Sequence, residues 1–173
     1  MTLANKITIL RLVLTPVLVI GLLQGSELWP LVIFVLSAIT DVLDGAAARW
    51  RGERSLLGSF LDPLADKLLI VSTTLTLAHL GRLPMWVFVV IFSRDLLIFL
   101  GWNIIYILTQ NFSITPRWPG KATTLLQMAS IVTLLVGPLQ PFSPYVLWAM
   151  IGLTAVSTVD YVWVGAKRLS EIG

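Results

Sequence analysis

Four aspartates lie close together in a chain that has few charges. They are Asp41, Asp44, Asp62 and Asp66, four of the nine acidic residues. Residues three or four apart share one face of a helix, so these aspartates form two facing pairs. Four neighbouring carboxylates repel one another unless cations neutralise them. Oxygen ligands favour Mg²⁺ or Mn²⁺, and two such ions about 4 Å apart can hold a pyrophosphate during phosphoryl transfer.

A structural explanation of the same residues is an internal salt-bridge cluster. Arg49 and Lys67 are the nearby cations, and two cations cannot neutralise four carboxylates. Arg49 lies one turn from the first pair and could bind a phosphate. Small residues between the pairs would let a nucleotide approach the backbone, although glycine and alanine also serve helix packing in membranes. These small residues are Gly45, Ala48 and Gly58.

The composition places these carboxylates in a membrane. Hydrophobic residues make up 57% of the 173 residues and charged residues only 12%, whereas soluble domains carry about a quarter charged residues. The chain has no cysteine, which excludes disulfides and thiolate metal sites. Apolar runs bounded by turn residues predict an all-α fold, a bundle of six transmembrane helices in one domain, residues 1–173. The predicted helices cover residues 5–24, 28–50, 58–80, 83–109, 120–137 and 144–166.

The basic residues predict the orientation of this bundle. Six helices place both termini on one side, and that side holds most of the cations near span ends, while the opposite loops hold only Arg82. The positive-inside rule therefore predicts cytoplasmic termini and an active site that faces the cytoplasm. The same placement explains the net charge of +3 without a nucleic-acid partner. The cations concerned are Lys6, Arg49, Arg51, Arg54, Arg117, Lys121, Lys167 and Arg168.

The pattern Asp41-x-x-Asp44-Gly45-x-x-Ala48-Arg49, eight residues, Gly58-x-x-x-Asp62-x-x-x-Asp66 resembles the signature of the CDP-alcohol phosphotransferase family. The resemblance implies that an alcohol attacks the lipid-bearing phosphorus of CDP-diacylglycerol and that CMP leaves. It further implies a homodimer, and a bacterial inner membrane is the expected location. By this resemblance, two divalent ions, Mg²⁺ or Mn²⁺, are bound by Asp41, Asp44, Asp62 and Asp66. Asp66 is also the implied general base. The implied CDP-binding residues are Gly45, Ala48, Arg49 and Gly58.

The acceptor alcohol is less closely defined. The candidate acceptor-binding residues are Arg94, Arg117 and Lys121, because buried cations beside a metal–phosphate site suit a second anion. Enzymes of this type that use glycerol 3-phosphate typically have a second arginine soon after the one at position 94, and this chain does not. This difference favours phosphatidylglycerol, as in cardiolipin synthases. Glycerol 3-phosphate, as in phosphatidylglycerophosphate synthases, is the alternative, because Arg117 and Lys121 could supply the missing charge.

Two other classes also place carboxylates in membranes. Intramembrane prenyltransferases bind pyrophosphate through aspartate-rich helices, but they are longer and lack this order of residues. Transporters line ion pathways with carboxylates, but the absence of an internal repeat and the grouping of the aspartates at one face argue against that class. Arg11 and Asp160, in the first and last predicted helices, are expected to pair with each other.

Overall fold

The computed structural model describes residues 3–51, 56–109 and 118–170, and this part of the chain is helical with short turns. Each predicted helix is present, with bounds that differ by a few residues. The largest difference is at the C-terminus, where the last helix continues to Ser170. The elements are α1 (Leu3–Leu23), α2 (Leu28–Arg51), α3 (Leu56–His79), α4 (Met85–Thr109), α5 (Trp118–Leu135), the 3₁₀ helix η1 (Gly137–Phe142) and α6 (Ser143–Ser170).

Two tight turns connect α1 to α2 and α3 to α4. Each contains a glycine with a positive φ, 77° at Gly25 and 72° at Gly81. The amide of Ser26 donates to the carbonyl of Gly21, and that of Arg82 donates to Leu77, both at 3.0 Å. These bonds are those of Schellman motifs, which need a left-handed residue that glycine adopts without steric cost. The turns make successive helices antiparallel.

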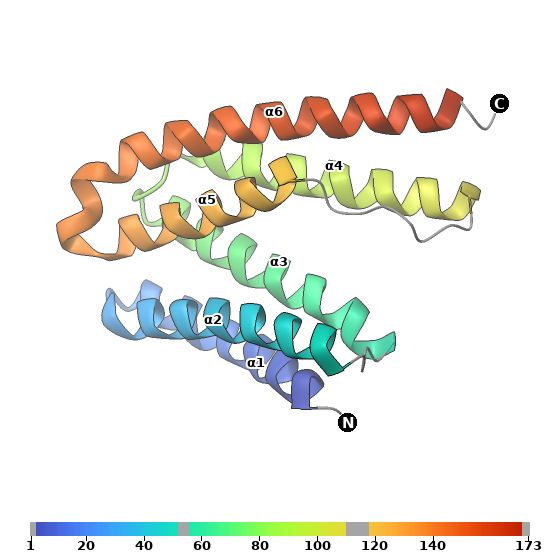
Figure 1. The fold of residues 1–173 in the computed structure, drawn as a ribbon. Coiled ribbons are helices and arrows are strands. Elements are labelled where there is room, and N and C mark those ends of the chain that lie inside the picture. The colour runs from blue at the N-terminus through green and yellow to red at the C-terminus, as the bar shows by residue number, and fades with distance from the viewer. Residues whose placement is uncertain (1–2, 52–55, 110–117, 171–173) are drawn as a thin grey trace.

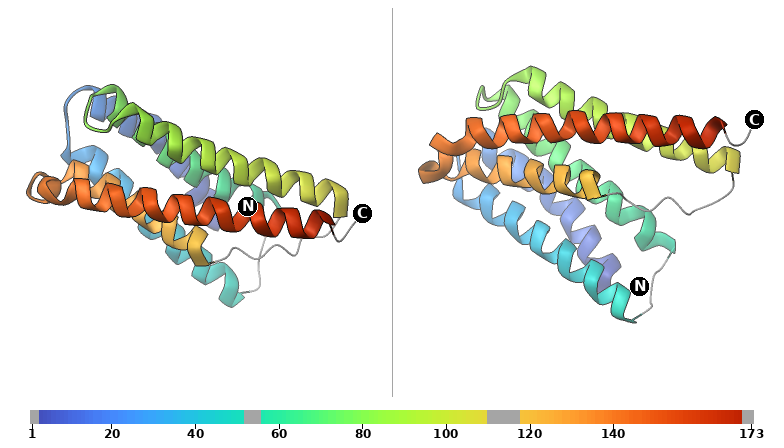
Figure 2. Two further views of the ribbon diagram at one scale, coloured as in Figure 1. Left: turned by 90° about the horizontal axis from the view of Figure 1, so that it is seen from above. Right: turned by 45° about the horizontal axis from the view of Figure 1, so that its top comes forward.

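The turns lie together at one end of the bundle, which we call the turn end; η1 also lies there (Figure 1). Glu27 and Arg82, one beside each tight turn, form an ion pair of 2.7 Å. The first residue of α1 and the last residue of α6 lie at the opposite end, which we call the terminus end (Figure 2). Helix α1 packs against both α2 and α3, and α6 packs against α4 and α5.

An apolar core fills the half of the bundle near the turn end. Leu18 and Phe34 contribute to it from α1 and α2, Leu77 from α3, Ile91 from α4 and Met150 from α6, and each is at most 2% exposed. Each of these residues lies nearer to its helix's turn end than to its other end. The buried charged residues described below lie further from the turn end than this core does, near the middle of their helices.

The outer surface of the bundle is strongly apolar. Large apolar side chains are exposed on every long helix, while many threonines and serines and the charged residues Arg11, Arg94 and Asp95 lie inside. An exposed apolar surface of this extent suits contact with lipid. Within the described residues, Gly137–Ala166 is long and apolar enough to cross a membrane, and shorter apolar stretches occupy Ile7–Leu23 and Leu28–Thr40.

Candidate active site

The four aspartates lie on the parts of α2 and α3 that extend toward the terminus end. Asp41 and Asp44 belong to α2, and Asp62 and Asp66 belong to α3. A rise of 1.5 Å per residue places them about 9–15 Å of helix from the ends of their helices. The structure therefore places all four within the bundle at comparable depth. Side chains are described up to Thr40 on α2 and from Leu64 on α3, so those of Asp41, Asp44, Ala48, Arg49 and Asp62 lie outside the description, as do the environments of Gly45 and Gly58.

Asp66, the predicted general base, forms an ion pair with Arg11 of α1. The side chain of Arg11 is 3% exposed and that of Asp66 is 26% exposed, so the pair extends from the interior toward an accessible side of α3. The sequence had suggested Asp160 as the partner of Arg11; the ion pair that the structure shows joins Arg11 of α1 to Asp66 of α3. Arg11 thus contacts one of the predicted functional aspartates.

Arg94 of α4 is buried and its guanidinium is held at several points. Its Nη1 donates to Asp95 Oδ1 at 2.8 Å and its Nη2 donates to Ser157 Oγ of α6 at 2.7 Å. Its central carbon lies 6.0 Å from the centre of the Tyr161 ring, within the range of a cation–π contact. Its Nε is buried and has no hydrogen-bond partner among the described residues. The direction of the Arg94 guanidinium is therefore fixed, while its Nε–H donor stays unused among the described residues.

Asp95 forms ion pairs with two cations from different helices. Besides Arg94, it forms an ion pair of 2.5 Å with Nζ of Lys67 on α3. Its side chain is only 4% exposed, and that of Lys67 is 42% exposed. Our reading of the sequence did not assign a role to Asp95, although an ionisable residue inside an apolar helix is a functional candidate by its position alone. The structure makes Asp95 the link between α3 and Arg94.

The start of α5 lies against the same arginine. A Cβ added at Gly120 would lie 3.2 Å from Tyr161 Oη and 3.5 Å from Arg94 Nη2, so the absence of a side chain permits this close approach. Lys121, the next residue, is exposed. Of the three predicted acceptor-binding residues, the structure places Arg94 and the segment of Lys121 together. Arg117 lies outside the described residues.

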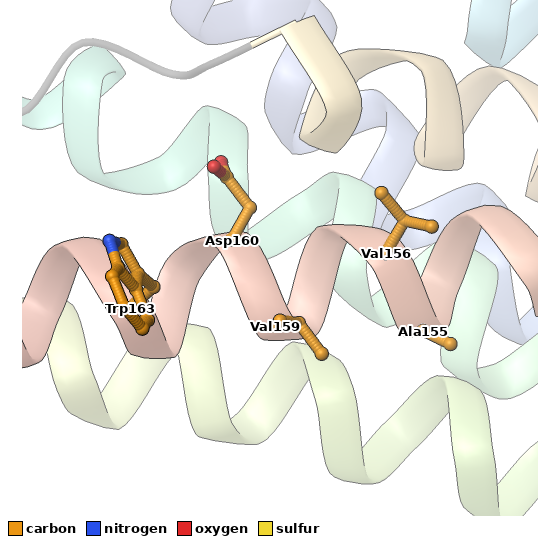
Figure 3. Close-up of a pocket in the computed structure, with 5 residues that line it drawn as sticks. All are labelled: Ala155, Val156, Val159, Asp160 and Trp163. Carbon is orange, nitrogen blue, oxygen red and sulfur yellow. The ribbon is translucent and has the colours of Figure 1, made fainter.

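An open groove of about 520 Å³ runs along α6 beside this region (Figure 3). Its lining is mainly apolar, with the carboxylate of Asp160 as the acidic group. Asp160 lies one turn beyond Ser157, the partner of Arg94, so the groove passes close to the buried charges. An apolar groove next to polar groups suits an amphiphilic molecule. The lining residues are Ala155, Val156, Val159, Asp160 and Trp163.

The donor set of the four aspartates fits divalent metal ions. Carboxylate oxygens are the preferred ligands of Mg²⁺ and Mn²⁺, and the four residues lie at similar distances along α2 and α3 from the ends of these helices. Asp66 is the one of the four whose side chain is described, and the described side chains by themselves form no group of three metal-ligating residues. Metal binding by Asp41, Asp44, Asp62 and Asp66 thus stays a prediction, as does CDP binding by Gly45, Ala48, Arg49 and Gly58.

Comparison with known proteins connects this arrangement to one family. Residues 1–159 match the family described as CDP-alcohol phosphatidyltransferase. A "Probable phosphatidylglycerophosphate synthase" of Mycobacterium tuberculosis is 38% identical, over 99% of this chain and 83% of its own. A "CDP-diacylglycerol--glycerol-3-phosphate 3-phosphatidyltransferase" of Bacillus subtilis is 31% identical over 92% of both chains. A "Probable cardiolipin synthase (CMP-forming)" of Drosophila melanogaster is 34% identical, over 94% of this chain and 57% of its own.

Proposed function

Because the chain belongs to the CDP-alcohol phosphatidyltransferase family, we propose that it transfers the phosphatidyl group of CDP-diacylglycerol to glycerol 3-phosphate and releases CMP. The observation that carries the acceptor is the close approach of two helices that bear basic residues. Arg94 of α4 is buried, and Gly120, the residue before Lys121 on α5, lies against its guanidinium. Basic residues on neighbouring helices suit a small acceptor that carries a phosphate dianion.

The approach of α5 to Arg94 affects the choice between the two acceptors, for which the sequence favoured phosphatidylglycerol. Phosphatidylglycerol was favoured because α4 has no second arginine after Arg94. In the folded chain the start of α5, which carries Lys121, lies against Arg94 and offers a second cation from another helix. The reason for favouring a lipid acceptor is therefore weaker. The names of the Mycobacterium and Bacillus relatives support the same proposal.

In the proposed reaction the acceptor hydroxyl attacks the phosphorus that bears the diacylglycerol, and the bond to CMP breaks. Asp66 accepts the hydroxyl proton, and its ion pair with Arg11 fixes the direction of the carboxylate. Asp41, Asp44, Asp62 and Asp66 would hold two divalent ions, which when bound supply positive charge for the leaving phosphate. Gly45, Ala48, Arg49 and Gly58 would hold the CDP portion.

Phosphatidylglycerol is the second candidate acceptor, and the groove on α6 favours it. The lining by Val156, Val159 and Trp163 would suit the acyl chains of a lipid beside the buried charges. A lipid acceptor with a single phosphate charge needs fewer cations than glycerol 3-phosphate does. In this reading the product is cardiolipin.

One assay separates the candidates. Purified enzyme in detergent receives CDP-diacylglycerol with either glycerol 3-phosphate or phosphatidylglycerol, and CMP release is measured with Mg²⁺, with Mn²⁺ and with chelator. We expect CMP with glycerol 3-phosphate and either metal, and none in chelator. Release with phosphatidylglycerol alone would refute the acceptor while leaving the family reaction intact. Undiminished release in chelator would refute the metal site.

We further propose that the terminus end faces the cytoplasm of a bacterial inner membrane and that the enzyme works as a homodimer. The orientation rests on the basic residues at the terminus end, since at the turn end Arg82 is paired with Glu27. A cysteine at Ser26, beside the α1–α2 turn, should react with an impermeant thiol reagent added outside intact cells. Labelling that requires permeabilised cells would reverse the orientation. Crosslinking in membranes tests the dimer.

A further inference from the structure

We infer that Asp95 is a positioning residue that couples the acceptor side of the site to the general base. The inference rests on the proposed function, which assigns the acceptor to Arg94 and proton transfer to Asp66. Asp95 contacts neither substrate in this account. It acts through two cations, Arg94 at 2.8 Å and Lys67 at 2.5 Å.

The first link runs from Asp95 to helix α3. Lys67 follows Asp66 directly, and successive residues of a helix point about 100° apart because a turn has 3.6 residues. Asp66 therefore reaches Arg11 on α1 while Lys67 reaches Asp95 on α4. Two adjacent residues hold α3 from two sides, so rotation of α3 about its axis would break both ion pairs. The Lys67–Asp95 pair thereby fixes the direction of Asp66.

The second link runs from Asp95 to the guanidinium of Arg94. Asp95 accepts a hydrogen bond from Nη1, and Ser157 accepts one from Nη2. With these two bonds the guanidinium lies over the ring of Tyr161. The buried Nε has no hydrogen-bond partner among the described residues. Without the carboxylate, Arg94 and Lys67 would lie close together as like charges, and mutual repulsion would move both. The direction of Arg94 toward an acceptor phosphate therefore depends on Asp95.

The two links make different kinetic predictions. Asp95→Asn removes the charge that serves both cations, so it should raise KM for glycerol 3-phosphate and lower kcat, each by about tenfold, with KM for CDP-diacylglycerol within about twofold. Lys67→Met breaks only the link to α3, so it should lower kcat and leave KM for glycerol 3-phosphate nearly unchanged. The double variant should have a kcat close to that of Asp95→Asn alone, because both changes remove one interaction. Asp95→Glu, which keeps the charge, should recover part of both losses.

The control is Glu27→Gln, which breaks the Arg82–Glu27 pair at the turn end and should leave both KM values unchanged. Thermal midpoints in detergent are measured for every variant.

Equal increases in both KM values for Asp95→Asn, or losses of kcat that multiply in the double variant, would overturn the inference. So would a lowered thermal midpoint with unchanged kinetics. If Asp95→Asn does not fold, the separation of kcat from KM in Lys67→Met decides the question. An inactive wild-type enzyme would instead refute the proposed function.

Discussion

The two halves of the bundle are held together by different interactions. Near the turn end, Leu18, Phe34, Leu77 and Met150 form an apolar core closed by glycine turns. Further from the turn end, near the middle of the helices, the interior contains Arg11, Asp66, Lys67, Arg94 and Asp95 in ion pairs. Buried ion pairs contribute little net stability, because desolvation offsets their attraction. The comparison indicates that the apolar half near the turn end maintains the fold, while the polar half contains the predicted functional residues.

The largest expected effect comes from removing one charge in the polar half. Asparagine at Asp41, Asp44 or Asp62 should lower CMP release by about 10²–10³-fold, as loss of one preorganised electrostatic contact does in other enzymes. Asp66→Asn should lower kcat far more than it weakens binding of CDP-diacylglycerol. The variants at Asp41, Asp44 and Asp62 should unfold at the same or a higher temperature than wild type without divalent ions, because one repelling charge is gone. CMP release and thermal midpoints with and without Mg²⁺ test this, and near-normal release by any of the three would contradict it.

A substitution in the apolar half is expected to have a smaller effect, and to lower stability while leaving the kinetics nearly unchanged. Leu77→Ala removes a fully buried side chain and should destabilise the fold by about 2 kcal/mol, the low end for buried leucines. The low end applies because burial in a membrane bundle gains packing contacts but little transfer from water. Both KM values should stay within about twofold of wild type. Thermal unfolding and kinetics on the same preparation check this, with the exposed Leu75 changed to alanine as the matched control. A change in acceptor KM would show that the halves are not separate.

The smallest expected effect is at a turn. Gly81 has a φ of 72° and open space where a Cβ would lie, so Gly81→Ala adds conformational strain without a clash. We expect a loss of about 1 kcal/mol in stability and unchanged CMP release. Gly152, which is helical and also has open space, is the matched control and should tolerate alanine or gain stability. Equal midpoints for the two alanine variants would show that the positive φ is not required.

The fold was largely readable from the sequence because its signals are local. Long apolar runs favour helices, and glycine or proline favours a break, so the six predicted helices agree with α1 to α6 apart from their edges. The spacing of Asp62 and Asp66 likewise needs only the helical repeat. The resemblance to the family signature rests on residues within one continuous stretch, 41–66. These features do not depend on which helix packs against which.

The partners of the buried charges depended on the tertiary structure. The ion pair of Arg11 with Asp66 was not predicted from the sequence. The sequence also suggested no role for Asp95, which joins Lys67 to Arg94 in the structure. Helices that are apolar on all sides carry little amphipathic signal, so their rotation and neighbours cannot be read from periodicity. Rotation and neighbours are set by side-chain packing between helices that are distant in the sequence. The sequence by itself therefore determined the helices and the aspartate signature, and the packing of α3 between α1 and α4 decided which charges meet.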